Sequence, residues 1–254
     1  MLILISDAFD NSLSDTLTKF GEITDDKSRI TEAEVVLIRS KTKVTKEYID
    51  IAPKLKLVIR GGVGLDNVDL EYAGEKGITV HNTAAASAIA VAECAFTLMI
   101  GITNHVARAD SSMRDGKWIK NELKRTELYK KTLGIIGLGR IGSELAKRAA
   151  AFEMNVIAYT PFNKKSDYAS VKLDLTDVLN VSDYVSLHLP LIDSTKGIIN
   201  SETLKEFKDG SFLINTGRGK TIVERDVVDA LQCGKLAGFG NDVWYSDPPE
   251  SNPF

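Results

Sequence analysis

The sequence has few residues of the kinds that form disulfide frameworks or metal centres. Its 254 residues include only two cysteines, Cys94 and Cys233, and their spacing is not that of a metal site. Both lie in stretches that are expected to be helical and partly apolar. We therefore expect reduced thiols in a cytoplasmic protein, and no metal ligand set.

An excess of positive charge is also missing. The chain has 32 Lys and Arg against 35 Asp and Glu, a formal net charge of −3, and no long basic run. We therefore expect no nucleic-acid partner. The opening stretch, MLILISDAFD, has an apolar run too short for a signal peptide and no basic region before it, so no targeting peptide is expected there.

Long apolar runs are nearly absent as well. The one stretch that could imitate a membrane span is AAASAIAVAECAFTLMIGI, residues 84–102, and it carries Glu93 near its middle. A bilayer penalises a charge at that depth. We therefore expect no membrane partner, and interpret this stretch as a helix buried between domains or subunits.

Short β-branched runs alternate with amphipathic helical stretches along the chain. This alternation predicts parallel sheets flanked by helices. The expected strands form two series, 2–6, 35–40, 55–60 and 78–82, then 131–136, 155–159, 171–173, 183–190, 211–216 and 236–244. The predicted fold class is therefore α/β, with two domains whose boundary lies near the helix expected at residues 88–105.

The motif GLGRIG follows one of these strands and opens a helix. In a dinucleotide site Gly137 permits the tight turn, Gly139 lets the backbone approach the pyrophosphate, and Gly142 lets the helix pack on the strand. The backbone N–H groups of Arg140 and Ile141 then point toward the phosphates. A plain strand–helix turn would leave three glycines at this spacing unexplained.

The next strand, NVIAY, ends without the acidic residue that usually binds an NAD ribose. Thr160 stands there instead, and it would make one weaker hydrogen bond while removing the charge that repels a 2′-phosphate. Lys164 and Lys165 follow, either as a source of positive charge at this site or as ordinary surface lysines. The pattern favours NADP or dual use over strict NAD use.

Several motifs together resemble the D-isomer-specific 2-hydroxyacid dehydrogenase family, and within it the phosphoglycerate dehydrogenase branch most closely. They span most of the chain: IRSKTKVTKEYID, IRGGVGLDNVDL, GITVHNTAAASAIAVAE, MRDGKW, TELYKKTLGIIGLGRIG, SLHLPLIDSTKGIIN, FLINTGRGKTIVERDVVDAL and LAGFGNDVW. The resemblance implies an NAD(P)-dependent enzyme that interconverts a D-2-hydroxyacid and a 2-oxoacid. It implies two Rossmann-like domains with a cleft between them, a substrate domain over residues 1–90 and an NAD(P)-binding domain over residues 91–254. It also implies a homodimer formed through residues 88–125.

The resemblance assigns roles to particular residues. Arg218 matches the arginine that binds the substrate carboxylate and the C2 oxygen, where a planar guanidinium can balance developing charge. A surface salt bridge is the alternative, but Arg218 follows a strand end, where ligands of α/β sheets bind. Val63 and Gly64 match the loop whose N–H groups hold the carboxylate, although this stretch is also compatible with a simple turn.

Further positions match the cofactor pocket of the family. Asp242 matches the aspartate that receives the nicotinamide carboxamide. Thr216 and Gly217 match backbone positions beside the nicotinamide, and His188 and Pro190 match a strand end that lines the pocket. His188 is also compatible with an ordinary hydrogen-bonded histidine at a strand end, and it is not our candidate proton donor.

The family's general acid/base is a histidine oriented by a glutamate. Asp247 stands at the position of that glutamate, although it is also compatible with a turn residue before Pro248, and Glu250 is less well in register. The three histidines of the chain match no position of the catalytic histidine. We expect it in a C-terminal segment that follows Phe254 and completes the substrate domain. If no such segment exists, a non-catalytic NAD(P)-binding scaffold becomes the rival function.

The substrate is less constrained by the sequence. Arg39, Lys41 and Arg60 all lie at strand ends and would form a basic cluster suited to a phosphate, or else they are solvated edge charges. The first candidate is 3-phosphoglycerate with its 2-oxoacid, phosphohydroxypyruvate, and the second is glyoxylate or hydroxypyruvate. A third is formate, because GNDVWYSDPP is similar to a stretch of the formate dehydrogenase branch.

Overall fold

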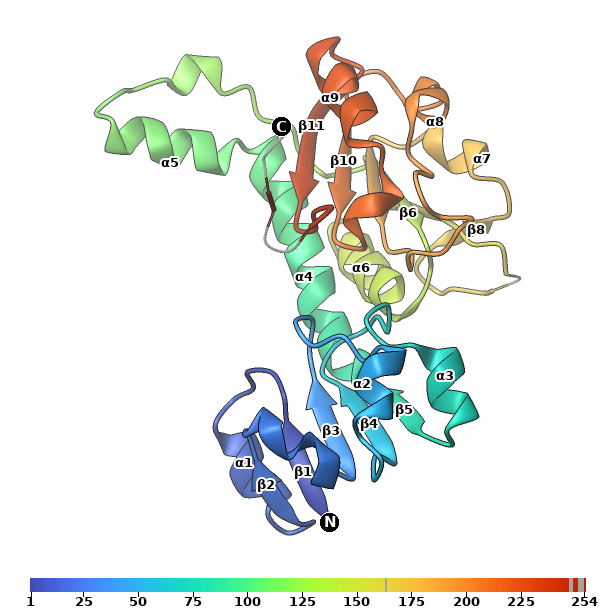
Figure 1. Ribbon diagram of the computed structural model, residues 1–254. Helices are drawn as coiled ribbons and strands as arrows, with labels where there is room; N and C mark the ends of the chain where they lie inside the picture. Colours follow the sequence, from blue (N-terminus) through green and yellow to red (C-terminus); the bar gives the residue numbers. More distant parts are fainter. Residues whose placement is uncertain (163, 247–248, 251–253) are drawn as a thin grey trace. The chain divides into compact units, whose positions relative to one another are not determined.

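A computed structural model describes residues 1–162, 164–246, 249–250 and 254. The chain divides into two compact units, unit 1 (Met1–Ser87) and unit 2 (Ala88–Phe254). Each contains one parallel sheet with helices around it (Figure 1). The predicted fold class of two parallel-sheet α/β domains is confirmed. The division at 87/88 falls inside the first turn of a helix that begins at Ala84.

Unit 1 is a five-stranded sheet in which every neighbouring pair of strands is parallel. The strand order is β2-β1-β3-β4-β5, so the chain changes direction across the sheet between β1 and β3. The strands are β1 (Leu2–Ile5), β2 (Glu22–Thr24), β3 (Val35–Ile38), β4 (Leu57–Arg60) and β5 (Thr79–Asn82). The helices are α1 (Ser12–Leu17), the 3-10 helix η1 (Lys27–Glu32), α2 (Lys46–Asp50) and α3 (Leu70–Glu75).

Alternation of side chains along each strand divides the core of unit 1 between the two faces of the sheet. Val36 and Ile38 belong to the cluster on one face, together with Leu4 and Val58. Val35 and Leu37 belong to the cluster on the other face, with Ile3. Because both faces are covered, the central strands consist of continuous apolar residues, as parallel strands usually do.

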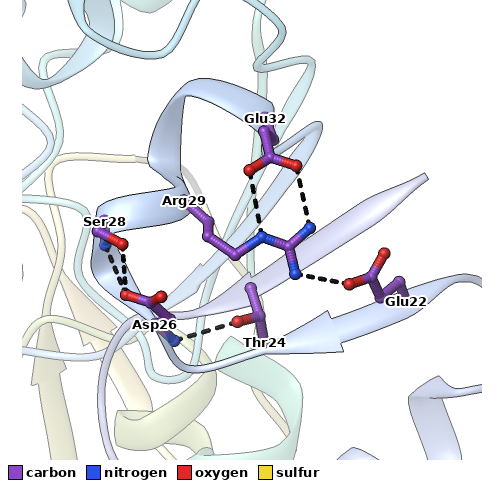
Figure 2. Close-up of polar contacts among 6 residues, drawn as sticks. All are labelled: Glu22, Thr24, Asp26, Ser28, Arg29 and Glu32. Carbon is purple, nitrogen blue, oxygen red and sulfur yellow. Dashed lines mark hydrogen bonds and ion pairs between the residues drawn. The ribbon is translucent and has the colours of Figure 1, made fainter.

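The edge of the unit 1 sheet at β2 is held by exposed polar contacts (Figure 2). Arg29 of η1 donates to Glu22 at 2.6 Å and to both carboxylate oxygens of Glu32 at 3.2 and 3.0 Å. Asp26 accepts from the backbone N–H of Ser28 at 3.0 Å and so caps the helix. The hydrogen bonds from Ser28 lower the pKa of Asp26. Side chains thus connect the edge strand to η1 where few apolar residues are present.

Unit 2 is a six-stranded parallel sheet of order β11-β10-β9-β6-β7-β8. Its first strand lies inside the sheet, and the chain crosses from one side of that strand to the other after β8, as in dinucleotide-binding domains. The strands are β6 (Thr132–Ile136), β7 (Asn155–Tyr159), β8 (Ser170–Lys172), β9 (Tyr184–Leu187), β10 (Ser211–Asn215) and β11 (Leu236–Asn241). The helices around them are α6 (Arg140–Ala151), α7 (Thr176–Leu179), α8 (Ser201–Lys205), η3 (Gly219–Thr221) and α9 (Glu224–Gln232).

The longest helix, α4 (Ala84–Thr103), contributes one stripe of its surface to the core of unit 2. Ala92, Ala95, Phe96 and Met99 are buried there, a spacing that places them on one helical face. Glu93, the charged residue near the middle of this apolar stretch, forms an ion pair with Arg148 of α6 at 2.9 Å. By length and composition α4 would also pass as a membrane span, and 28% of its apolar window is buried within the chain.

Beyond α4 the chain forms an arm composed of α5 (Val106–Arg114) and the 3-10 helix η2 (Lys120–Glu122). Within unit 2 this arm stands away from the sheet (Figure 1). An ion pair of Arg108 with Glu122, at 2.7 Å, joins its two segments. The arm encloses a groove of about 600 Å³ whose lining includes Ile100, Met113 and Trp118.

Candidate functional site

The glycine loop of unit 2 joins β6 to α6, and two of its glycines are required by the fold itself. Gly137 has φ of 101°, and a Cβ atom there would lie 2.7 Å from the carbonyl oxygen of His188. A Cβ atom on Gly142 would lie 2.3 Å from the carbonyl oxygen of Gly137. The turn and the close approach of α6 to β6 therefore account for both residues.

The third glycine, Gly139, has no such internal reason. Its φ is −78°, which any residue adopts, and a Cβ atom there would meet none of the described atoms within 4 Å. Gly139 and Arg140 are exposed at the start of α6, where the first backbone N–H groups have no partner within the helix. The open space in front of these donors suits an anion, as the predicted contact of Arg140 and Ile141 with a pyrophosphate requires.

The residues predicted to recognise the ribose lie beside this loop. Thr160 is buried, with 5% of its surface exposed, and its hydroxyl accepts from the backbone N–H of Phe162 at 3.4 Å. Lys164 donates from Nζ to the carbonyl oxygen of Leu138 and lies 3.5 Å from the hydroxyl of Ser143. The ammonium group of Lys164 is therefore positioned at the glycine loop, whereas Lys165 is simply exposed.

His188 follows β9 at the same edge of the sheet. Its Nε2 is 2.9 Å from the hydroxyl of Ser186, and its Nδ1 is 3.4 Å from the hydroxyl of Thr216. Part of the residue reaches the surface, but dense packing around the ring removes water and lowers the pKa of His188 to about 4. The ring is therefore neutral at neutral pH, and it connects the ends of β9 and β10.

The loop after β10 carries Arg218, and Asn215 shapes this loop. The side chain of Asn215, which is fully buried, donates from Nδ2 to the carbonyl oxygen of Arg218 at 3.1 Å. Its Oδ1 accepts from the backbone N–H of Gly217 at 3.1 Å. Arg218 is half-buried, and its Nη1 donates to the carbonyl oxygen of Gly217 at 2.8 Å. Asn215 was not among the predicted site residues, although its place as a polar residue at the end of a buried strand is a signal in the sequence.

The two remaining cofactor candidates lie at the same sheet edge. Asp242 follows β11 and is exposed, and its backbone N–H donates to the carbonyl oxygen of Asn215 at 3.0 Å. Burial raises the pKa of the Cys94 thiol, and the nearby charge of Asp242 raises it further, so the thiol stays protonated. Pro190 is exposed after β9, and its carbonyl oxygen accepts from the hydroxyl of Thr195 at 2.6 Å.

In unit 1 the candidate substrate residues also gather at one sheet edge. Arg60 is the last residue of β4, and it lies opposite Ile38 of β3 and Asn82 of β5. The loop that follows is held by β5: Asn82 donates from Nδ2 to the carbonyl oxygen of Val63 at 2.6 Å. Gly64 comes next in this loop and is half-buried.

A second contact fixes the start of the same loop. The backbone N–H of Gly62 donates to the hydroxyl of Thr83 at 2.9 Å. Asn82 and Thr83 were not among the predicted site residues. Their place directly after a strand, in the sequence HNT, was the signal that could have identified them.

The catalytic carboxylate predicted at Asp247 lies outside the described residues. Its alternative, Glu250, is exposed, and its backbone N–H donates to the hydroxyl of Ser246 at 3.2 Å. Of the other two histidines, His81 is exposed in β5 and His105 contacts the carbonyl oxygen of Lys124 through Nε2 at 2.9 Å. The described residues therefore contain no histidine–carboxylate hydrogen bond.

Comparison with known proteins provides independent findings. Residues 96–254 match the family described as D-isomer specific 2-hydroxyacid dehydrogenase, NAD binding domain, and residues 3–172 match the catalytic domain of the same family. A hydroxypyruvate reductase of Thermotoga maritima is 47% identical over 220 residues, which cover 87% of this chain and 72% of that protein.

Two further comparisons extend this finding. A D-3-phosphoglycerate dehydrogenase of Methanocaldococcus jannaschii is 42% identical over 229 residues, covering 89% of this chain but only 44% of that protein. Among solved structures, the D-lactate dehydrogenase of Aquifex aeolicus complexed with NAD and lactic acid has a TM-score of 0.86 at 31% identity. The match covers 97% of this chain and 78% of that one.

The contrast between two glycines of the loop is testable by substitution. Alanine at Gly139 meets open space, so Gly139→Ala should leave the melting temperature unchanged while its methyl group weakens dinucleotide binding about tenfold. Alanine at Gly142 meets a backbone oxygen, so Gly142→Ala should destabilise unit 2 by about 1 to 3 kcal/mol. Thermal melts and fluorescence titration with NADH and NADPH measure both effects. A Gly139→Ala variant that binds either dinucleotide as wild type does would contradict this assignment.

Proposed function

Because this chain belongs to the D-isomer-specific 2-hydroxyacid dehydrogenase family, we propose that it is an NAD(P)-dependent oxidoreductase of D-2-hydroxyacids and 2-oxoacids. The family predicted from the motifs is confirmed by matches over residues 3–172 and 96–254. One geometric observation within unit 2 supports the proposal. The open glycine loop and Arg218 follow strands of one sheet and face the same edge, so a dinucleotide and an anionic substrate could be bound together.

Arg218 has the chemistry that such a reaction needs. Its guanidinium can hold a carboxylate and the C2 oxygen of a 2-oxoacid, and it favours the negative charge that builds on that oxygen as the C2 carbon is reduced. A bound nicotinamide supplies or accepts the hydride. Asn215 keeps the loop of Arg218 in shape through its two hydrogen bonds. His188 is neutral and bonded on both ring nitrogens, which suits a pocket wall rather than the acid/base.

The substrate that we propose first is 3-phosphoglycerate with phosphohydroxypyruvate. Arg39 directly follows β3, and Arg60 ends the neighbouring strand β4. Two arginines at adjacent strand ends suit a phosphate in addition to the carboxylate. Hydroxypyruvate is the second candidate, favoured by the 47% identical hydroxypyruvate reductase.

Turnover tests this function directly. The purified protein should reduce phosphohydroxypyruvate with a higher kcat/KM than hydroxypyruvate. Arg218→Lys keeps the charge but loses the planar fork, so kcat/KM should fall by roughly 100-fold with dinucleotide affinity unchanged. Arg225→Lys, an exposed arginine of α9 paired with Asp229 at 3.1 Å, is the matched control and should behave as wild type. Dinucleotide binding without turnover of any 2-oxoacid or formate would favour a non-catalytic scaffold instead.

For the cofactor we propose NADP or dual use. Thr160 contributes no negative charge at the ribose position, and the ammonium group of Lys164 lies at the glycine loop. A positive charge there would favour a 2′-phosphate. The NAD-complexed lactate dehydrogenase supports NAD for the fold in general, so the preference between the two cofactors must come from such local residues.

Two charge-neutralising substitutions test whether the charge acts specifically from the position of Lys164. Lys164→Met should raise the KM for NADPH about three- to tenfold and leave the KM for NADH nearly unchanged, because only NADPH carries the extra phosphate. Lys165→Met removes the same charge one residue away and is the control. Steady-state kinetics gives the KM of each variant for NADH and for NADPH. A wild type with a large preference for NADH would rule out the NADP proposal.

We also propose that the arm pairs two copies of the chain. Trp118, Met113 and Val106 expose 76%, 56% and 55% of their surfaces, and α4 leaves most of its apolar window uncovered. A contiguous apolar surface of this kind is typical of a protein–protein interface.

Measuring the oligomeric state of the chain in solution tests this proposal. Sedimentation or light scattering should give a dimer mass for the wild type. Trp118→Ser removes a large apolar contact and should raise the dissociation constant of the dimer at least tenfold. Phe162→Ser, which replaces an aromatic side chain that is 75% exposed on another loop, should leave the dimer intact. A monomeric wild type at working concentration would exclude the proposal.

A further inference from the structure

The loop after β3, residues 39–43, departs from the sheet in unit 1 and loses its ladder partners there. Two of its backbone N–H groups are bound by one buried carboxylate instead. Oδ2 of Asp7 accepts from the backbone N–H of Arg39 at 2.6 Å and of Thr42 at 3.2 Å. Oδ1 of Asp7 accepts from the hydroxyl of Thr42 at 2.7 Å. Asp7 therefore binds one side of this loop at three points.

The opposite side of the same two residues is bound by Asn67. Its Nδ2 donates to the carbonyl oxygen of Arg39 at 2.7 Å and to that of Thr42 at 2.6 Å. Asn67 also accepts at its own carbonyl oxygen from the backbone N–H of Val44 at 2.8 Å. Asn67 follows the Gly61–Gly64 loop in the chain, so it joins the two loops that carry the candidate substrate residues.

These contacts meet at the Cα atom of Arg39. Its backbone N–H is held by Asp7 and its carbonyl oxygen by Asn67, so the rotations on both sides of that Cα atom are restricted. The aliphatic stem lies beside Gly61, where a Cβ atom would be 3.5 Å from Cγ of Arg39. Among the described residues, the guanidinium makes one hydrogen bond, from Nη1 to the carbonyl oxygen of Ala8 at 3.3 Å.

We infer that Asp7 and Asn67 are positioning residues that hold Arg39 ready for the anionic group at the far end of the substrate. The inference rests on the proposed function, in which Arg39 binds a phosphate. Preorganisation is the physical reason: a flexible arginine loses side-chain and backbone entropy on binding, and a loop already fixed loses less. Selectivity for a phosphorylated 2-oxoacid then depends on two residues that need not touch it.

The carboxylate of Asp7 is suited to this task. Burial by itself would raise its pKa, but the hydrogen bonds from the hydroxyl of Thr42 and from the two backbone N–H groups outweigh burial and lower it. Asp7 is therefore ionised at neutral pH. Hydrogen bonds to a charged acceptor are stronger than those between neutral groups, which favours one loop conformation over others.

Kinetic selectivity tests the inference. Asn67→Asp keeps the size of the side chain but replaces two N–H donors by an acceptor that faces carbonyl oxygens. Asp7→Ala removes the hydrogen bonds on the other side of the 39–43 loop. Each should raise the KM for phosphohydroxypyruvate about tenfold while the KM for hydroxypyruvate and both kcat values stay within about twofold. Asp10→Asn, an exposed carboxylate that bonds only Ser12 within the described structure, is the matched control.

A graded pair of variants covers the case in which Asp7→Ala does not fold. Thr42→Val loses the hydroxyl that donates to Asp7, whereas Thr42→Ser retains it, so serine should restore the selectivity that valine loses. Coupling gives a second readout. In an Arg39→Gln background, Asp7→Ala and Asn67→Asp should cause no further loss of phosphate selectivity, because both act through Arg39.

The outcomes separate this inference from the function on which it rests. Equal changes in KM for both substrates, or effects that add fully to Arg39→Gln, would show that Asp7 and Asn67 only stabilise the fold and would overturn the inference. A wild type that turns over neither 2-oxoacid, or an Arg39→Gln variant with unchanged selectivity, would overturn the phosphate proposal itself, and the inference with it.

Discussion

Parallel strand pairing is the constraint on which the rest of this structure depends. Parallel strands all end at the same edge of their sheet, so loops that are far apart in the chain become neighbours there. In unit 2 this brings together the glycine loop, His188, Arg218 and Asp242 from the ends of four strands. In unit 1 it brings Arg39 beside Arg60. The candidate site residues named here lie at these two edges because helices occupy the faces of the sheets.

At these edges the backbone loses its ladder partners, and short polar side chains replace them. Asn215, Asn82 and Asn67 each bond a backbone group of a site loop, and Asp7 bonds two. A buried polar group without a partner is costly. These hydrogen bonds restrict the backbone of the loops that carry the candidate residues Arg218 and Arg39.

Much of the fold could be predicted from the sequence, because buried parallel strands have long apolar runs and the glycine loop has a fixed spacing. The short edge strand β2 was missed, since its three residues have no such run and its hold on η1 comes from Arg29. The loop supports Asp7 and Asn215 were missed for another reason. Their roles depend on partners that only the folded chain brings near, as with Asp7 and Thr42, 35 positions apart.

The proposed function depends on a dinucleotide phosphate binding the open backbone donors at the start of α6. Amide chemical shifts of the isotopically labelled protein, followed during titration with NADPH and NADH, measure this most directly. We expect the largest shift changes on the backbone N–H groups of Gly139, Arg140 and Ile141. Unchanged resonances for these three residues at saturating dinucleotide would contradict it.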